Sequence, residues 1–119
     1  MYLFDSSVII EILKGNEVLV EKFKNIPLVT IDLAYGEVYY YFLRTGLNTQ
    51  QVKNLNFEFL PYSRENIELA MEILLERKKS VKDFSFVDSM VYTIGTKNHL
   101  IVLTRDFGFK GLPNVDILP

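Results

Sequence analysis

The segment FSFVDSMVYTIGTKNHLIVLTRDFGF, residues 84–109, contains both a helical pattern and an apolar strand. Phe86–Lys97 has the spacing of a helix, whereas residues 100–103, LIVL, are apolar without interruption. A strand that is apolar on both sides is typical of a parallel sheet covered by helices on both faces. Asp106 follows shortly after this strand. The segment therefore predicts an α/β fold with a carboxylate at the carboxyl end of a buried strand.

The rest of the chain repeats this alternation of strand and helix. Further apolar runs of strand length lie at 2–4, 28–31, 57–60 and 115–118. Segments of helical period lie between them, at 7–14, 17–25, 33–44, 48–55 and 64–79. This order predicts a mostly parallel sheet with helices on both faces. In such folds ligands bind beyond the carboxyl ends of the strands, so functional residues are expected there.

Length and composition favour a single domain over residues 1–119. The chain has 119 residues, 49% of them hydrophobic, which is enough to build one core. It has no cysteine, which excludes disulfides and thiolate metal sites and is typical of a reducing cytoplasm. No apolar run approaches the roughly 20 residues of a membrane span. We therefore expect a cytoplasmic protein that does not enter a membrane.

The charge of the chain constrains its ligands. The formal net charge is -2 and the isoelectric point is near 5.4, whereas nucleic-acid-binding domains usually carry a basic excess. A nucleic-acid function would therefore have to explain the acidic residues. With one histidine and no cysteine, carboxylates are the abundant metal ligands, and they suit Mg²⁺ or Mn²⁺ better than Zn²⁺.

Four acidic residues stand where the predicted sheet would hold a ligand. Asp5 ends the first strand, Asp88 lies in the first turn of a helix, and Asp106 follows the strand at 100–103. Glu37 lies inside the helix that follows the second strand. Carboxylates that converge without a basic partner raise one another's pKa, so keeping them ionised requires a cation. A hard divalent cation bound by some of them and by water meets that requirement.

Each aspartate also has a purely structural interpretation. Asp5 or Ser6 can cap the helix that follows, Asp88 can form a capping box with Ser85, and Asp106 can belong to a turn. Glu37 has no such role, because it lies mid-helix among apolar and aromatic residues. Together the four favour a metal site. The remaining acidic residues are interpreted as solvent-exposed: Glu11, Glu17, Glu21, Glu65, Glu68, Glu72, Glu76 and Asp116.

Successive motifs along the chain resemble those of the PIN domain family, in particular the small VapC toxins of toxin–antitoxin pairs. The motifs are YLFDSSVIIEILKGNE (2–17), LVTIDLAYGEVYYYFLR (28–44), the segment 84–109 and GLPNVDIL (111–118). The resemblance implies a three-layer α/β/α sandwich with a central, mostly parallel sheet. It also implies an acidic cluster of Asp5, Glu37, Asp88 and Asp106 that holds Mg²⁺ or Mn²⁺, with hydroxyl groups of Ser6 or Ser7 and Thr104 beside it. Many relatives carry a second acid after the aspartate at 106, where this chain has Gly108.

The resemblance further implies a metal-dependent endoribonuclease and an antitoxin partner. We expect Asp5 and Asp88 to be the main metal ligands, with Glu37 and Asp106 completing the site. Ser6 and Thr104 are expected to position the carboxylates or contact phosphate. Arg105 and Lys82 are expected to bind RNA phosphates, together with Arg77, Lys78 and Lys79, although the last three can equally be cations that finish a helix.

The apolar run at 38–43, VYYYFL, is wider than one buried helix face requires. It predicts a homodimer interface, and burial in the core of one chain is the competing interpretation.

Two other classes of protein compete with this interpretation. A phosphoacceptor receiver domain would have paired acids after the first strand, an aspartate after the third and a lysine after the fifth. Here the third run ends in Leu60-Pro61-Tyr62 and the fifth is followed only by Pro119, which argues against that class. A catalytically silent PIN-like interaction module is the remaining alternative, and metal-dependent cleavage of RNA would distinguish a nuclease from it.

Overall fold

The strands pair in parallel throughout the sheet. In the computed structural model, which describes residues 1–119, β4 (Ile101–Thr104) lies between β1 (Tyr2–Phe4) and β5 (Val115–Ile117). A second pair consists of β2 (Leu28–Thr30) and β3 (Phe57–Phe59). All three pairings are parallel, as the alternation of strands and helices predicts.

A side-chain hydrogen bond connects the two groups of strands. Thr30, at the end of β2, is fully buried and donates its hydroxyl to the carbonyl oxygen of Phe4 in β1, 2.7 Å away. No backbone ladder joins β1 to β2. The sheet therefore consists of two hydrogen-bonded parts that meet between β1 and β2.

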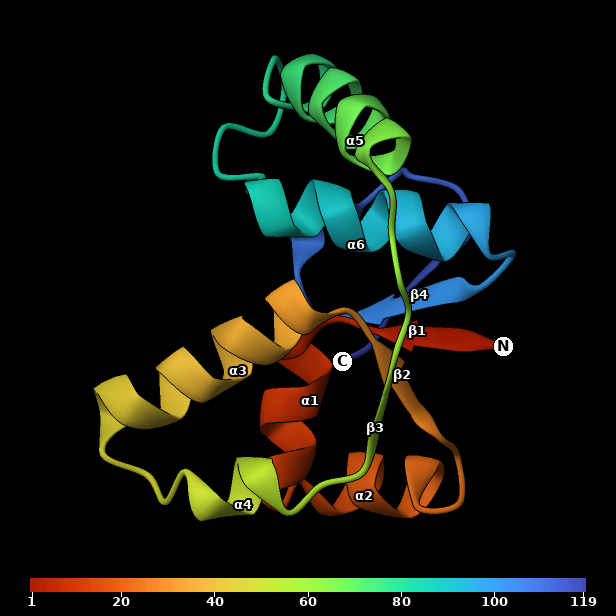
Figure 1. Ribbon diagram of the computed structural model, residues 1–119. Coiled ribbons are helices and arrows are strands. Elements are labelled where there is room, and N and C mark those ends of the chain that lie inside the picture. The colour runs from red at the N-terminus through yellow and green to blue at the C-terminus, as the bar shows by residue number, and fades with distance from the viewer.

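Helices cover both faces of the sheet (Figure 1). On one side lie α5 (Arg64–Arg77) and α6 (Phe86–Lys97). On the other lie α1 (Ser6–Leu13), α2 (Glu17–Phe23), α3 (Asp32–Thr45) and the short α4 (Gln50–Lys53). The chain thus forms the expected three-layer α/β/α sandwich.

The alternation of side chains along each strand divides the core into two clusters. Leu3 and Val102 point to the side of α6, whereas their chain neighbours Phe4 and Leu103 point to the side of α1. Successive residues of a strand face opposite sides of the sheet, so uninterrupted apolar strands feed both clusters. Val102 and Leu103 are buried on the two faces as predicted, whereas Leu100 is half-buried and Ile101 at the strand start is exposed.

The helix at 86–97 is the central helix of the fold. All of its residues from Asp88 to Gly95 are buried. A Cβ on Gly95 would come within 2.8 Å of Cγ2 of Val102, so glycine is needed where this helix crosses β4. Ser85 caps the helix by accepting from the backbone of Asp88, whose side chain accepts from Ser85 in return.

Most predicted elements lie within a few residues of their observed positions. The largest difference is at 48–55, where only Gln50–Lys53 is helical. In addition, α3 continues to Thr45 and ends at Gly46, whose φ of 74° closes the helix in the left-handed conformation. None of the helices is both long enough and apolar enough to cross a membrane.

Candidate active site

Asp5 occupies the junction between β1 and α1. Its backbone is extended, with φ −71° and ψ 155°, and its side chain makes no capping bond although it stands at the N-cap position. Instead Oδ2 accepts hydrogen bonds from Thr104 Oγ1 at 2.7 Å and from Ser7 Oγ at 2.9 Å. The side chain therefore turns away from its helix and toward the end of β4.

The second carboxylate oxygen of Asp5 has no partner. Asp5 is 2% exposed, and Oδ1 is buried without any hydrogen bond. A buried acceptor without a donor costs free energy, and an ionised one costs more. Burial raises the pKa of Asp5, and the charge of Asp106 adds to this, while the two hydroxyl groups and the backbone amide of Ser6 oppose it. A cation at Oδ1 would supply the missing partner.

Backbone amides orient the two hydroxyl groups that hold Asp5. Thr104 Oγ1 accepts from the amide of Asp106 at 3.0 Å, and Ser7 Oγ accepts from the amide of Arg105 at 2.9 Å. Each hydroxyl can then donate its proton to Asp5. The end of β4 is in this way connected to the start of α1, and the free oxygen of Asp5 has a defined direction.

Glu37 is half-buried in α3, as its apolar surroundings predict. Its Oε1 accepts from Ser6 Oγ at 2.8 Å. Burial raises the pKa of Glu37, and the charges of Asp5 and Asp106 raise it further, against the effect of the Ser6 hydroxyl. Ser6 thus positions a carboxylate, as expected.

Asp88 lies almost fully buried in the first turn of α6. It is 8% exposed, and its Oδ2 accepts from the amide of Ser85 at 2.9 Å. Burial, together with the charges of Asp5 and Asp106, raises the pKa of Asp88 to about 7, although its bonds to Ser85 oppose the shift. The capping-box interpretation is therefore confirmed, and it is compatible with a place in the acidic centre.

Asp106 begins the short 3₁₀ helix Phe107–Phe109. It is half-buried, and its Oδ1 accepts from the amide of Gly108 at 2.8 Å. A Cβ on Gly108 would lie 3.1 Å from that oxygen, so any larger residue would crowd the carboxylate. The residue at 108 thus supports Asp106 by its small size rather than by adding a charge.

The four carboxylates influence one another electrostatically, yet they do not form a closed ligand set. Asp5 and Asp106 each raise the pKa of both Glu37 and Asp88. No group of three or more acidic or histidine side chains is close enough to surround one metal ion. The arrangement fits a hard cation held by one or two carboxylates and several water molecules, as Mg²⁺ often is. The unpartnered Asp5 oxygen supports this fit.

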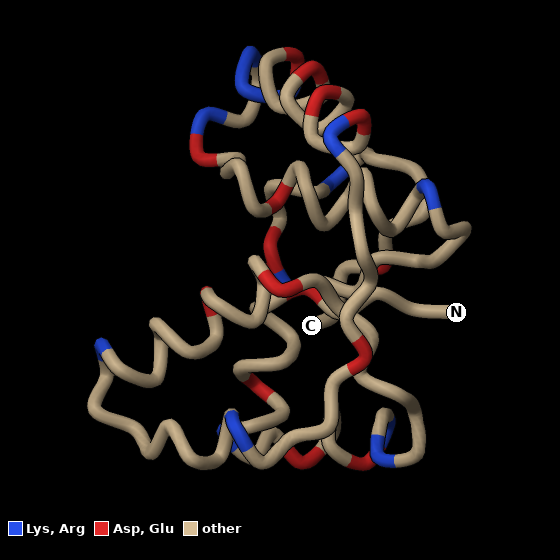
Figure 2. Tube along the Cα trace, viewed as in Figure 1, with Lys and Arg blue, Asp and Glu red and all other residues tan.

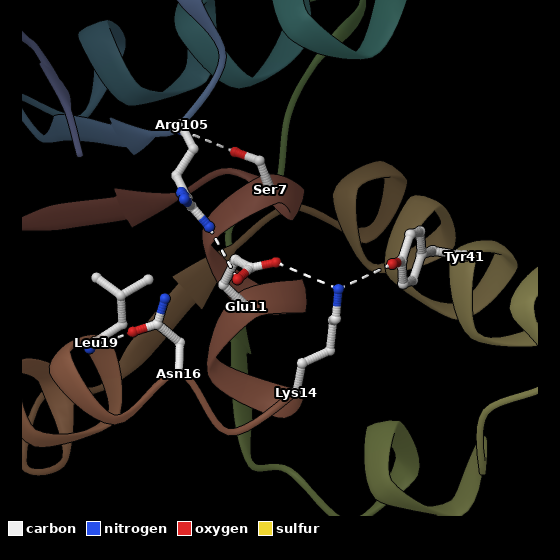
Figure 3. A network of polar contacts seen from close by, with 7 residues as sticks. All are labelled: Ser7, Glu11, Lys14, Asn16, Leu19, Tyr41 and Arg105. Carbon is white, nitrogen blue, oxygen red and sulfur yellow. Dashed lines mark hydrogen bonds and ion pairs between the residues drawn. The ribbon is translucent and has the colours of Figure 1, made fainter. Parts of the chain in front are cut away.

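Arg105, expected to bind phosphate, forms an ion pair in the structure. Its Nη1 lies 2.9 Å from Oε1 of Glu11, and the other carboxylate oxygen of Glu11, Oε2, lies 3.6 Å from Nζ of Lys14 (Figure 3). Lys14 in turn donates to the Tyr41 hydroxyl at 3.2 Å. The interpretation of Glu11 as a solvent-exposed acid is therefore wrong, since its side chain is only 25% exposed. No local signal around Glu11 indicates this pairing, because its partner Arg105 lies in a distant segment of the chain.

The basic segment at the end of α5 is also largely engaged. Arg77 donates to the carbonyl oxygens of Gly108 and Lys110, and so binds the loop after Asp106. Lys79 pairs with Glu76 at 2.9 Å, and Lys78 donates to the carbonyl oxygen of Lys82. For Arg77 the structural interpretation fits better than phosphate binding. Lys82 is exposed in the turn before α6, where Figure 2 shows a basic stretch beside an acidic one, with further basic residues at the end of α5.

The fold and the position of these carboxylates define a class of protein: an α/β/α domain with an acidic centre at the carboxyl ends of parallel strands. The PIN domain family model matches residues 2–115, and the chain therefore belongs to the PIN domain family, whose members are generally nucleases.

A solved structure described as a toxin–antitoxin complex from Klebsiella pneumoniae has a similar fold. The TM-score is 0.78 at 18% sequence identity, over 98% of this chain and 96% of the other. The search of functionally curated proteins gave no match.

Proposed function

We propose that this PIN domain is a Mg²⁺- or Mn²⁺-dependent endoribonuclease and the toxin of a VapBC-type toxin–antitoxin pair, acting in the cytoplasm. The observation that carries the proposal is the buried, unpartnered Oδ1 of Asp5 at the centre of an acidic cluster. Family membership and the resemblance to VapC toxins support the same chemistry.

The residues have distinct tasks in the proposed reaction. Asp5 and Asp88 would hold the metal ion, which would supply positive charge for the scissile phosphate and would acidify a water molecule. Glu37 and Asp106 hold water molecules, and one of them accepts the proton of the attacking water. Ser6 positions Glu37, while Ser7 and Thr104 orient Asp5.

The metal site can be tested without measuring cleavage. Asp5→Asn keeps the size of the side chain and an oxygen that accepts from Thr104 and Ser7, but removes the charge. We expect Mn²⁺ to bind the wild-type protein and to bind Asp5→Asn at least about 10-fold more weakly, because the loss of a ligand typically costs more than 1.4 kcal/mol. Asp116→Asn, which changes an exposed acid in β5, serves as the control. Equal Mn²⁺ affinity in all three proteins would contradict the assignment.

Cleavage of RNA requires its own test. Wild-type protein should cut single-stranded RNA only with Mg²⁺ or Mn²⁺, and Asp88→Asn should lose this activity while remaining folded. Metal binding without any cleavage would favour the alternative of a silent interaction module. Lys82 and Arg105 are proposed to contact phosphates, so RNA binding should weaken as salt is raised.

We further propose that the protein forms a homodimer and binds an antitoxin. On α3, Tyr40 is 63% exposed and Leu43 59%, and Leu47 just beyond the helix is 40% exposed, so one apolar stripe lies in solvent. The similarity to a chain of a toxin–antitoxin complex supports an antitoxin partner. A dimeric mass at micromolar concentration, reduced to a monomeric mass by Leu43→Asp, is the expected result. A monomeric wild-type protein would contradict the dimer.

A further inference from the structure

Arg105 is a basic residue whose backbone borders the acidic centre. It lies between Thr104 and Asp106 in the chain, and its amide donates to Ser7 Oγ at 2.9 Å. The same hydroxyl donates to Asp5 Oδ2 at 2.9 Å, so one hydroxyl group separates the Arg105 backbone from the Asp5 carboxylate. A guanidinium group this close to buried carboxylates would be expected to pair with them.

The side chain of Arg105 instead lies against α1, with Nη1 2.9 Å from Oε1 of Glu11 (Figure 3). The carboxylates of the centre do not benefit from its charge. Burial and neighbouring carboxylates raise the pKa of both Asp5 and Glu37, whereas an arginine lying among these groups would lower the pKa of each. The positive charge of Arg105 is thus directed away from the centre that its backbone borders.

The carboxylate of Glu11 is held from a second side. Its Oε2 lies 3.6 Å from Nζ of Lys14, which donates to the Tyr41 hydroxyl on α3 at 3.2 Å. Glu11 therefore stands between two cations on the surface of α1, as Figure 3 shows. The side chains of Glu11 and Arg105 are only 25% and 32% exposed, so water screens this pair less than it screens a pair on the open surface.

Without Glu11 the guanidinium group of Arg105 would have no partner on α1. Asp106 is its neighbour in the chain, and Asp5 lies across the Ser7 hydroxyl. The buried Oδ1 of Asp5 lacks a hydrogen bond, and a guanidinium group offers both donors and positive charge. It would then compete with a divalent cation for the same carboxylates.

We propose that Glu11 is a positioning residue that keeps the side chain of Arg105 out of the metal site. The proposal rests on the proposed metal-dependent function, because it concerns the access of a cation to Asp5 and Asp106. Glu11 is not a ligand in this arrangement, and it acts only through Arg105. The chain can in this way carry a basic residue beside its acidic centre without filling the centre with its own cation.

The proposal can be tested by titrating purified variants with Mn²⁺, after urea unfolding has shown that each is folded. Glu11→Gln should bind Mn²⁺ about 10-fold more weakly than wild type, a loss typical of changes just outside the ligands of a metal. Glu11→Gln combined with Arg105→Gln should recover the wild-type affinity, because the competing cation is gone. Glu21→Gln is the matched control, since it removes the acid of a more exposed ion pair, with Lys24, and it should leave the affinity unchanged.

The possible failures of this test are distinguishable. If wild type binds Mn²⁺ and Glu11→Gln binds it equally well, the positioning role is refuted and the metal site stands. If the double variant binds as weakly as Glu11→Gln, Glu11 does not act through Arg105 and the proposal is wrong. If wild type itself binds no Mn²⁺, the proposed metal site fails, and this inference fails with it.

Discussion

Replacing Asp88 by asparagine should stabilise the metal-free protein and abolish its stabilisation by metal. The pKa of Asp88 is raised from 3.8 to about 7, so between those values the folded state binds more protons than the unfolded state. The stability that the protonated Asp88 carboxyl group contributes is fully present below about pH 4 and is lost as the pH rises through about 7. Asparagine keeps an oxygen that accepts from the Ser85 amide but carries no charge, so the helix cap survives.

The size of the effect follows from the pKa difference. A pKa difference of about three units would correspond to about 4 kcal/mol if the Asp88 carboxyl group were fully shielded from solvent. Water and counterions reach part of this site, so we expect about half of that, about 2 kcal/mol. Asp5 and Glu37 also have raised pKa values, so Asp88→Asn should retain a smaller decline of stability with pH.

The assay is urea unfolding in the presence of a chelator, from pH 5 to pH 8. The assay range covers about two of the three units between the unfolded and folded pKa, so wild-type protein should lose about 1.4 kcal/mol more than Asp88→Asn over it. Millimolar Mg²⁺ should restore stability only to the wild type. Ser85→Ala is the matched control, because it removes the cap and lowers stability by about 1 kcal/mol without changing the charge. Parallel pH curves for wild type and Asp88→Asn would refute the electrostatic reasoning.

Three further predictions concern single contacts. Gly95→Ala should destabilise the protein by about 1–3 kcal/mol, because the added Cβ would meet Val102. Gly36→Ala, at an exposed position of α3 with open space around it, should stabilise the protein by about 0.5–1 kcal/mol. Thermal melts of the two variants test this difference. Thr104→Val should reduce cleavage about 10- to 100-fold by leaving Asp5 Oδ2 short of a donor, and Thr104→Ser should retain activity; an unchanged rate in Thr104→Val would contradict this role. Arg77→Met should lower the free energy of unfolding, measured by urea titration, by about 1–3 kcal/mol, because the carbonyl oxygens of Gly108 and Lys110 lose their donor. Arg77→Lys should not restore this stability. Full stability of Arg77→Lys would argue against a role that needs both contacts of the guanidinium group.

Local patterns predicted the layers of the fold and the residues of the acidic centre. Uninterrupted apolar runs identified the strands, and their alternation with helices predicted parallel pairing, which all three pairings show. Glu37 was detectable because its neighbours are apolar, and it is indeed half-buried beside Ser6. These signals are short-range, so one sequence is enough to reveal them.

Contacts between distant segments were not predictable in the same way. Arg77 and the loop carbonyl of Gly108 are 31 residues apart, and nothing in the basic run ERKKSVKD separates the arginine that binds this loop from the exposed Lys82. Similarly, the pairing of Glu11 with Arg105 depends on how α1 lies against the end of β4. Charge patterns show which side chains can pair, whereas only the packed structure shows which ones do.

The hydroxyl bond between Thr104 and Asp5 spans 99 positions of sequence. During synthesis the ribosome therefore produces Asp5 early, while the residue that orients it emerges only after β4 has been made. Contacts of such long range form late and slowly in folding. A nascent chain should consequently lack the hydroxyl group that orients Asp5 until the segment through β4 has emerged and packed against α1.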